Sequence, residues 1–79
     1  MVMISGAARG LGFAVARRLA GDGFTVSLGA RDVGALRMAH EAVPEARCHF
    51  STYDATDPAT AGSWVGATIE RFGRIDALI

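Results

Sequence analysis

The sequence predicts a three-layer α/β fold in which helices cover a parallel β-sheet, and three observations support this class. Strand-like and helix-like segments alternate along the 79 residues, as they do in βαβ units. Residues 1–12, MVMISGAARGLG, pass from an apolar run through a glycine-rich turn into a helical pattern. Asp57 followed by Pro58 marks a helix start, because the carboxylate can cap the helix and proline fits its first position.

The first half of the chain contains two expected strands and two expected helices. Val2–Ser5 and Phe24–Leu28 are the strands. Gly10–Ala20 is the helix between them, because apolar residues recur there at every fourth position, at Leu11, Val15 and Leu19. A second helix is expected to begin after Asp32, which can cap it, and to end before Pro44.

The second half of the chain continues the alternation. Cys48–Thr52 is the expected third strand and Ile75–Ile79 the fourth. Between them, a helix that ends at Gly73 is expected to bury one face, formed by Ala61, Val65, Thr68 or Ile69, and Phe72. Right-handed crossovers would place the first two helices on one face of the sheet and the third on the other, with strand order 3-2-1-4.

The expected sheet has one thinly covered face and an unpaired fourth strand. Strands of parallel sheets are normally covered on both faces, and an exposed edge invites association. We therefore expect residues 1–79 to form one unit without an internal domain boundary, and to be part of a larger fold that is truncated at Ile79.

Composition argues against several classes of function. Eight acidic and eight basic residues balance, which disfavours a general nucleic-acid binder or a protein of acidic membrane surfaces. All the basic residues are arginine, so the sequence offers no lysine base. Cys48 is the only cysteine, and His40 and His49 have no partners at metal-ligand spacing. We expect no metal site and a cytoplasmic protein without a signal peptide or membrane span.

Three glycines in the turn after the first strand predict a phosphate-binding loop. Gly6 would let the backbone turn sharply, Gly10 would admit a ligand where a Cβ would collide, and Gly12 would let the helix lie close to the sheet. The pyrophosphate of a dinucleotide could then bind free N–H groups at the positive end of the helix.

Three segments and one arginine, taken in order, are more specific than the glycines alone. SGAARGLG at Ser5–Gly12, DATD at Asp54–Asp57 and FGRIDALI at Phe72–Ile79 resemble the TGxxxGxG loop, the DVTD segment and the FGRIDVLV run of the short-chain dehydrogenase/reductase family. Arg31 stands where NADP-preferring members carry a basic residue. The resemblance covers essentially the whole chain. It implies a Rossmann-type fold and hydride transfer between a nicotinamide and a carbonyl or alcohol carbon.

The resemblance also implies which residues bind the cofactor. Residues 1–79 would be the NADP-binding Rossmann domain in part, the N-terminal portion of a longer domain. The catalytic serine and Tyr-x-x-x-Lys pair of the family are absent here, so no catalytic residue is expected and the stretch alone should be inactive. The cofactor-binding residues would lie in the glycine-rich loop and at the ends of the second and third strands: Gly6, Ala8, Arg9, Gly10, Leu11, Gly12, Ala30, Arg31, Asp54 and Ala55.

Charge favours NADP over NAD as the cofactor. Ala30 stands where an acidic residue would bind the ribose of NAD, and Arg31 and Arg9 could together bind the extra phosphate of NADP. Two solvated surface arginines are the plain alternative. Asp32 is a rival ribose-binding acid, although its position favours a helix cap, and Asp54 could contact the adenine or simply form a turn.

Two other functions remain open. A non-catalytic dinucleotide-binding module, acting as a truncated sensor or an assembly subunit, would lack the Tyr-x-x-x-Lys pair in its native chain. A methyltransferase-type domain is the weaker alternative, because Arg31 stands where an acidic residue would be needed. For the favoured oxidoreductase we expect a small-molecule carbonyl or alcohol substrate and a homo-oligomer when complete, with no nucleic-acid or membrane partner.

Overall fold

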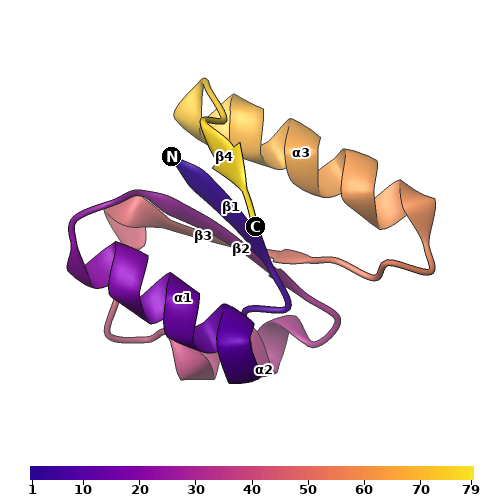
Figure 1. Cartoon of the computed structure of the whole chain (residues 1–79). Coiled ribbons are helices and arrows are strands. Elements are labelled where there is room, and N and C mark those ends of the chain that lie inside the picture. The colour runs from indigo at the N-terminus through magenta and orange to yellow at the C-terminus, as the bar shows by residue number, and fades with distance from the viewer.

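The computed structural model describes all residues from Met1 to Ile79 as one parallel sheet with helices on both faces (Figure 1). The elements follow in the order β1 (Val2–Ser5), α1 (Gly10–Gly21), β2 (Val26–Ala30), α2 (Val33–Ala39), the short 3-10 helix η1 (Glu45–Arg47), β3 (Cys48–Thr52), α3 (Pro58–Phe72) and β4 (Ala77–Leu78). The four strands pair in the order β3-β2-β1-β4, all parallel. Fold class and strand order are therefore as the sequence predicts.

The helices divide between the two faces of the sheet. Figure 1 shows α1 and α2 together on one side and α3 alone on the other. This is the arrangement that right-handed crossovers produce. Because the strands are parallel, the loops that follow β1, β2 and β3 all lie at the same edge of the sheet.

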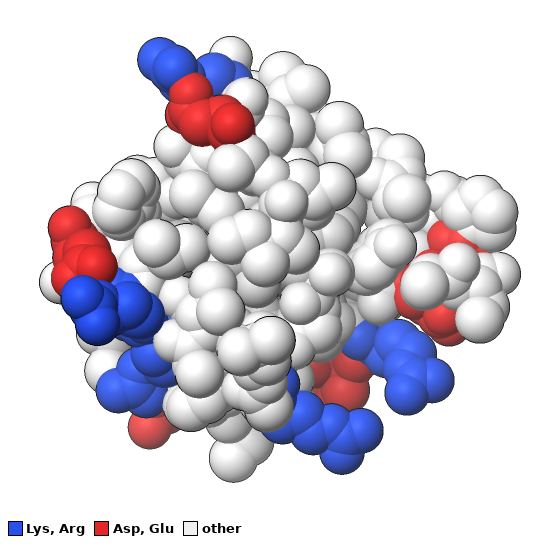
Figure 2. Space-filling view, viewed as in Figure 1, with Lys and Arg blue, Asp and Glu red and all other residues white.

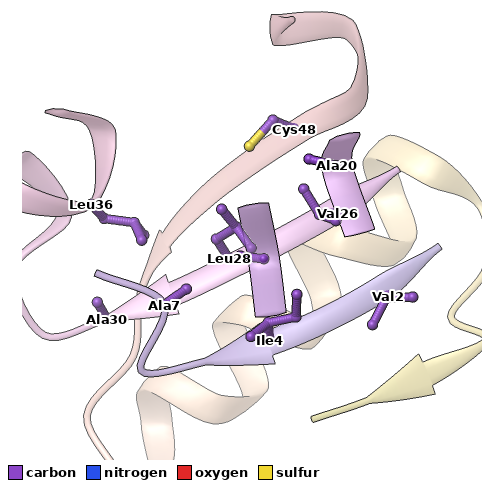
Figure 3. Packing of buried hydrophobic residues seen from close by; sticks show 10 residues of the cluster. Val2, Ile4, Ala7, Ala20, Val26, Leu28, Ala30, Leu36 and Cys48 are labelled. Atoms are coloured by element: carbon purple, nitrogen blue, oxygen red, sulfur yellow. The ribbon is translucent and has the colours of Figure 1, made fainter. Parts of the chain in front are cut away.

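Most of the core lies between the sheet and the two helices α1 and α2. Ten buried residues form it, and Figure 3 shows side chains of β1, β2 and β3 meeting Ala20 of α1 and Leu36 of α2. The buried residues of α1 are Ala16 and Ala20, whereas Leu11 is 80% exposed. The predicted inward position of Leu11 is therefore wrong. Ala16 and Ala20 thus present small side chains to the sheet, and at its first turn α1 approaches the backbone of Gly6 closely.

The opposite face is held by a buried polar chain between α3 and β2. The Trp64 indole Nε1 donates to Ser27 Oγ at 2.9 Å, Ser27 Oγ lies 2.7 Å from Thr68 Oγ1, and Thr68 Oγ1 donates to the Trp64 carbonyl. Every group in this chain has a partner, as buried polar groups require. Gly29 leaves room for the indole, because a Cβ there would lie 2.9 Å from Trp64.

This packing turns α3 away from the predicted face. Trp64 and Thr68 are buried, whereas Val65 and Ile69 are 41% and 48% exposed. The burial of Thr68 confirms one of the two predicted alternatives, Thr68 or Ile69, whereas the prediction is wrong at Val65. The hollow over Gly29 accepts the large indole of Trp64, and its partner Thr68 follows one helical turn later.

Some element boundaries also differ from the predictions. β2 begins at Val26 rather than Phe24, and α2 ends at Ala39, well before Pro44. Ile75–Ile79 contains only the short strand β4, although backbone bonds from Asp76 N to Met1 O and from Ile79 N to Met3 O extend the pairing on either side. No helix is both long and apolar enough to cross a membrane.

Candidate functional site

An open cleft of about 610 Å³ lies beyond the carboxyl ends of the strands. Its walls come from three successive loops, those that follow β1, β2 and β3. The lining residues are Ser5, Gly6, Ala8, Arg9, Ala30, Arg31, Asp32, Ala35, Tyr53, Asp54, Ala55 and Thr56. Open α/β sheets bind their ligands at this edge.

Backbone geometry explains the glycines of the loop after β1. Gly6 and Gly10 adopt φ angles of +62° and +64°, which are strained for residues with a Cβ. Gly12 has a different role, because a Cβ there would lie 2.3 Å from the carbonyl oxygen of Gly6. The predicted sharp turn at Gly6 and the close approach at Gly12 are thus both present. Together they bring the first turn of α1 against the end of β1.

Of the three α-helices, only α1 begins without a side-chain cap. Asp32 accepts a hydrogen bond from Ala35 N at 3.1 Å in α2, and Asp57 accepts one from Ala59 N in α3. Arg9, at the N-cap of α1, makes no such bond, and the first turn holds no acidic residue. The N–H groups of the first turn of α1 therefore stay free. With the helix dipole they form a place where an anion is stabilised.

Two arginines of the cleft stay unpaired in this structure. The other six bind partners: Arg17 and Arg37 lie over phenylalanine rings, Arg18 and Arg74 pair with aspartates, and Arg47 and Arg71 donate to backbone carbonyls. Only Arg9 and Arg31 make no ion pair, hydrogen bond or cation–π contact, and both line the cleft. Figure 2 shows arginine side chains exposed at the lower right, beyond the carboxyl ends of the strands.

The two carboxylates of the cleft are already engaged in local bonds. Asp32 caps α2, as predicted. The Oδ1 atom of Asp54 accepts bonds from the Oγ1 and N atoms of Thr56 at 2.7 and 2.9 Å. These two bonds, and then the nearby charge of Arg31, lower the pKa of Asp54, so the carboxylate is ionised at neutral pH. The Asp54 backbone is also fastened to α3 through Thr60 Oγ1.

All 79 residues match the protein-family model described as short chain dehydrogenase. The chain belongs to this family.

Relatives among known proteins agree with this assignment. Agropine synthesis reductase of Rhizobium rhizogenes is 44% identical over 79 residues, which are 100% of this chain and 18% of that protein. The alcohol dehydrogenase of the archaeon Thermococcus sibiricus, solved with 5-hydroxy-NADP, matches with a TM-score of 0.89 and 31% identity over 98% of this chain and 34% of its own. An NADPH-dependent reductase involved in bacilysin biosynthesis matches with a TM-score of 0.88 and 26% identity over 98% of this chain and 32% of its own.

The chain thus spans between 18% and 34% of the length of these relatives. It corresponds to the N-terminal portion of a short-chain dehydrogenase, an oxidoreductase family that uses NAD or NADP. The cleft at the carboxyl edge of its sheet lies in the nucleotide-binding Rossmann portion of the fold.

The cleft of this short-chain dehydrogenase portion brings most of the predicted site residues together. Gly6, Ala8, Arg9, Ala30, Arg31, Asp54 and Ala55 line it. The remaining three predicted residues do not: Gly10 and Leu11 are exposed on the first turn of α1, and Gly12 packs beneath Gly6. Tyr53 is not among the predicted site residues, yet it lines the cleft, and its ring packs on that of Trp64 with the centroids 5.1 Å apart. Its position directly before Asp54 was the available signal.

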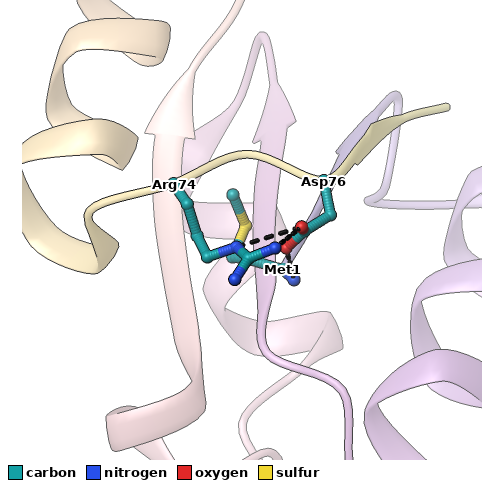
Figure 4. Close-up of polar contacts among 3 residues, drawn as sticks. All are labelled: Met1, Arg74 and Asp76. Carbon is teal, nitrogen blue, oxygen red and sulfur yellow. Dashed lines mark hydrogen bonds and ion pairs between the residues drawn. The ribbon is translucent and has the colours of Figure 1, made fainter.

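Other titratable groups of the chain lie outside the cleft. Burial raises the pKa of the Cys48 thiol to about 11, which keeps it protonated and unreactive. Burial likewise lowers the pKa of His49. Asp76 binds the Met1 ammonium at 2.7 Å and also Arg74, at the amino end of the sheet (Figure 4).

Replacing Asp76 with asparagine should flatten the acid part of the stability profile. The hydrogen bond from the Met1 ammonium, and then that from Arg74, lowers the pKa of Asp76 in the folded chain. Such a carboxylate stabilises the fold above its unfolded pKa of about 4, and this contribution is lost as the pH falls through the folded pKa. Urea unfolding at neutral and at acidic pH should show that the free energy of unfolding decreases less on acidification for Asp76→Asn than for the wild type. Parallel profiles would contradict this role.

Proposed function

We propose that this chain is the NADP-binding part of an oxidoreductase that transfers a hydride between the nicotinamide and a carbonyl or alcohol carbon. The observation that carries the proposal is the state of the charges in the cleft. Arg9 and Arg31 are free, whereas the carboxylates of Asp32 and Asp54 are occupied by local hydrogen bonds. A phosphate on the adenine ribose suits this arrangement, because free guanidinium groups attract it and each carboxylate is held by bonds within its own loop.

Each wall of the cleft has a part in this proposal. Next to the lining residue Arg9, the free N–H groups of Gly10 and Leu11, at the positive end of α1, would hold the pyrophosphate. Arg9 and Arg31 would hold the additional phosphate that distinguishes NADP from NAD. Asp54 and the backbone of Ala55 would lie beside the adenine. When bound, the cofactor would donate or accept the hydride, and this chain would supply its position and charge complement.

Bond-breaking groups would come from elsewhere in the complete enzyme. The chain contains no lysine, and its single tyrosine, Tyr53, is followed four residues later by Asp57 rather than by a lysine. We therefore propose that residues 1–79 are part of a longer domain. That domain would complete the substrate pocket for a small carbonyl or alcohol compound, and it would provide the contacts of a homo-oligomer.

Titration calorimetry with NADPH and NADH tests the proposed cofactor. We expect NADPH to bind at least about tenfold more tightly, since a charge-assisted phosphate contact contributes about 1.5–3 kcal/mol. Equal affinities would contradict the NADP preference. Saturable binding of S-adenosylmethionine with none of NADPH would overturn the dinucleotide assignment altogether. NADPH oxidation by the native polypeptide then separates a reductase from a module that only binds.

A further inference from the structure

His40 forms a buried hydrogen bond to the glycine-rich loop, and this bond has no part in the cofactor contacts proposed above. It follows α2 directly, as its C-terminal cap, and is 1% exposed. Its Nε2 atom lies 2.7 Å from the carbonyl oxygen of Ala7. A carbonyl oxygen can only accept, so Nε2 must carry the hydrogen and donate it. The other ring nitrogen, Nδ1, is buried and has no partner, which leaves the neutral Nε2–H tautomer as the form that fits.

The bond reaches a point of the loop where it restricts the backbone most. Ala7 follows Gly6, whose left-handed conformation gives the chain its turn, and it is fully buried. Its N–H donates to the carbonyl of Gly29 at 3.3 Å, so both polar groups of the Ala7 backbone are held, one by β2 and one by His40. Glycines on either side would otherwise leave the loop with many accessible conformations.

The His40 ring also packs against the helix whose N-terminus faces the cleft. Its centroid lies 5.3 Å from that of the Phe13 ring, in the first turns of α1. His40 lies at the C-terminal end of α2. The N-terminal end of α2 lies beside Arg31 and is capped by Asp32. A helix of this length spans about 10 Å. The helix α2 therefore connects the arginine wall of the cleft with the loop wall.

We propose that His40 is a positioning residue for the dinucleotide, a role that rests on the proposed function of the cleft. Its imidazole fixes Ala7 and so keeps the free N–H groups of α1 in the arrangement that receives phosphate. If the loop has this arrangement in only a fraction of the molecules, the apparent affinity for the dinucleotide decreases in proportion to that fraction. A residue that only fills the core would be replaced equally well by an apolar side chain of similar volume.

Two substitutions of His40 distinguish the effect of its hydrogen bond from the effect of its side-chain volume. His40→Leu keeps much of the volume and removes the donor, whereas His40→Gln offers an amide donor near the position of Nε2. Leu36→Val, in the buried face of the same helix, is the control for loss of packing. We expect His40→Leu to raise the Kd for NADPH about five- to tenfold. His40→Gln should stay within about twofold of the wild type, and Leu36→Val should lower stability while leaving Kd unchanged.

Amide hydrogen exchange of the free native protein provides the second measurement. The Ala7 N–H, bonded to Gly29, should exchange about tenfold faster in His40→Leu relative to the amides of β1, and at the wild-type rate in His40→Gln. Equal exchange and equal Kd for His40→Leu and the wild type would overturn the proposal. If the wild type fails to bind NADPH, the cofactor assignment fails instead, and the Ala7 exchange rate still decides whether His40 holds the loop.

Discussion

Replacing Arg31 with aspartate should weaken NADPH binding about a hundredfold and NADH binding by less than about threefold. Arg31 follows β2 directly, is exposed, and makes no bond to another group of the chain. Its guanidinium is therefore free to bind a phosphate. Aspartate at this position would repel the phosphate of NADPH, while it would offer the ribose hydroxyls of NADH a hydrogen-bond acceptor. The two cofactors should thus respond very differently.

Arg37→Asp is the matched control for this experiment. It changes the net charge by the same amount, but the Arg37 side chain lies over the Phe50 ring at 5.2 Å rather than in the cleft. Calorimetric titration at two salt concentrations should show only a small loss of NADPH affinity, screened by salt. Equal losses for NADPH and NADH in Arg31→Asp, or equal effects of Arg31→Asp and Arg37→Asp, would show that Arg31 does not bind the distinguishing phosphate.

Local sequence signals predicted the elements of the fold but not all of their buried faces. Asp32 and Asp57 cap helices in the structure as the sequence predicts, since a cap depends on residues within one turn. The buried side of α3 depends on β2, more than thirty residues away, where Gly29 makes room for Trp64. Apolar spacing alone fitted a second helical face equally well, and only the shape of the sheet chooses between them.

The same distinction applies to the candidate site. The glycine spacing and the arginine after β2 were sufficient to predict two walls of the cleft, because motifs of this kind are local. That Arg9 and Arg31 are the unpaired arginines follows only from where the other six find partners. The bond from His40 to Ala7 joins residues 33 positions apart. No periodicity or motif in the sequence indicates such a contact, so the sequence predicts no role for His40 at the site.

Gly12→Ala should destabilise the protein by about 3 kcal/mol, near the upper end of the usual cost of overpacking. The added Cβ would lie 2.3 Å from the Gly6 carbonyl oxygen and 3.0 Å from that of Ser5. Both are backbone atoms, so no side chain can rotate away, and α1 must move from the end of β1. A domain of this size is stable by only about 4–12 kcal/mol. Urea unfolding should therefore show a large decrease in the midpoint.

Gly66→Ala makes the same chemical change where the opposite sign is expected. Gly66 lies on the exposed side of α3, and apart from the neighbouring backbone of the helix itself no atom lies within 4 Å of the position of its missing Cβ. Alanine is favoured over glycine in a helix by about 1 kcal/mol, so this variant should be more stable than the wild type. The difference between the two variants removes the general effect of exchanging glycine for alanine. The difference in free energy of unfolding between the two variants therefore measures the contact between α1 and the Gly6 turn. A difference near zero would mean that α1 does not need to approach the loop so closely.

The same contact places the N–H groups of α1 beside the cleft. Gly12→Ala should therefore also bind NADPH more weakly under conditions where it stays folded, whereas Gly66→Ala should keep the wild-type affinity.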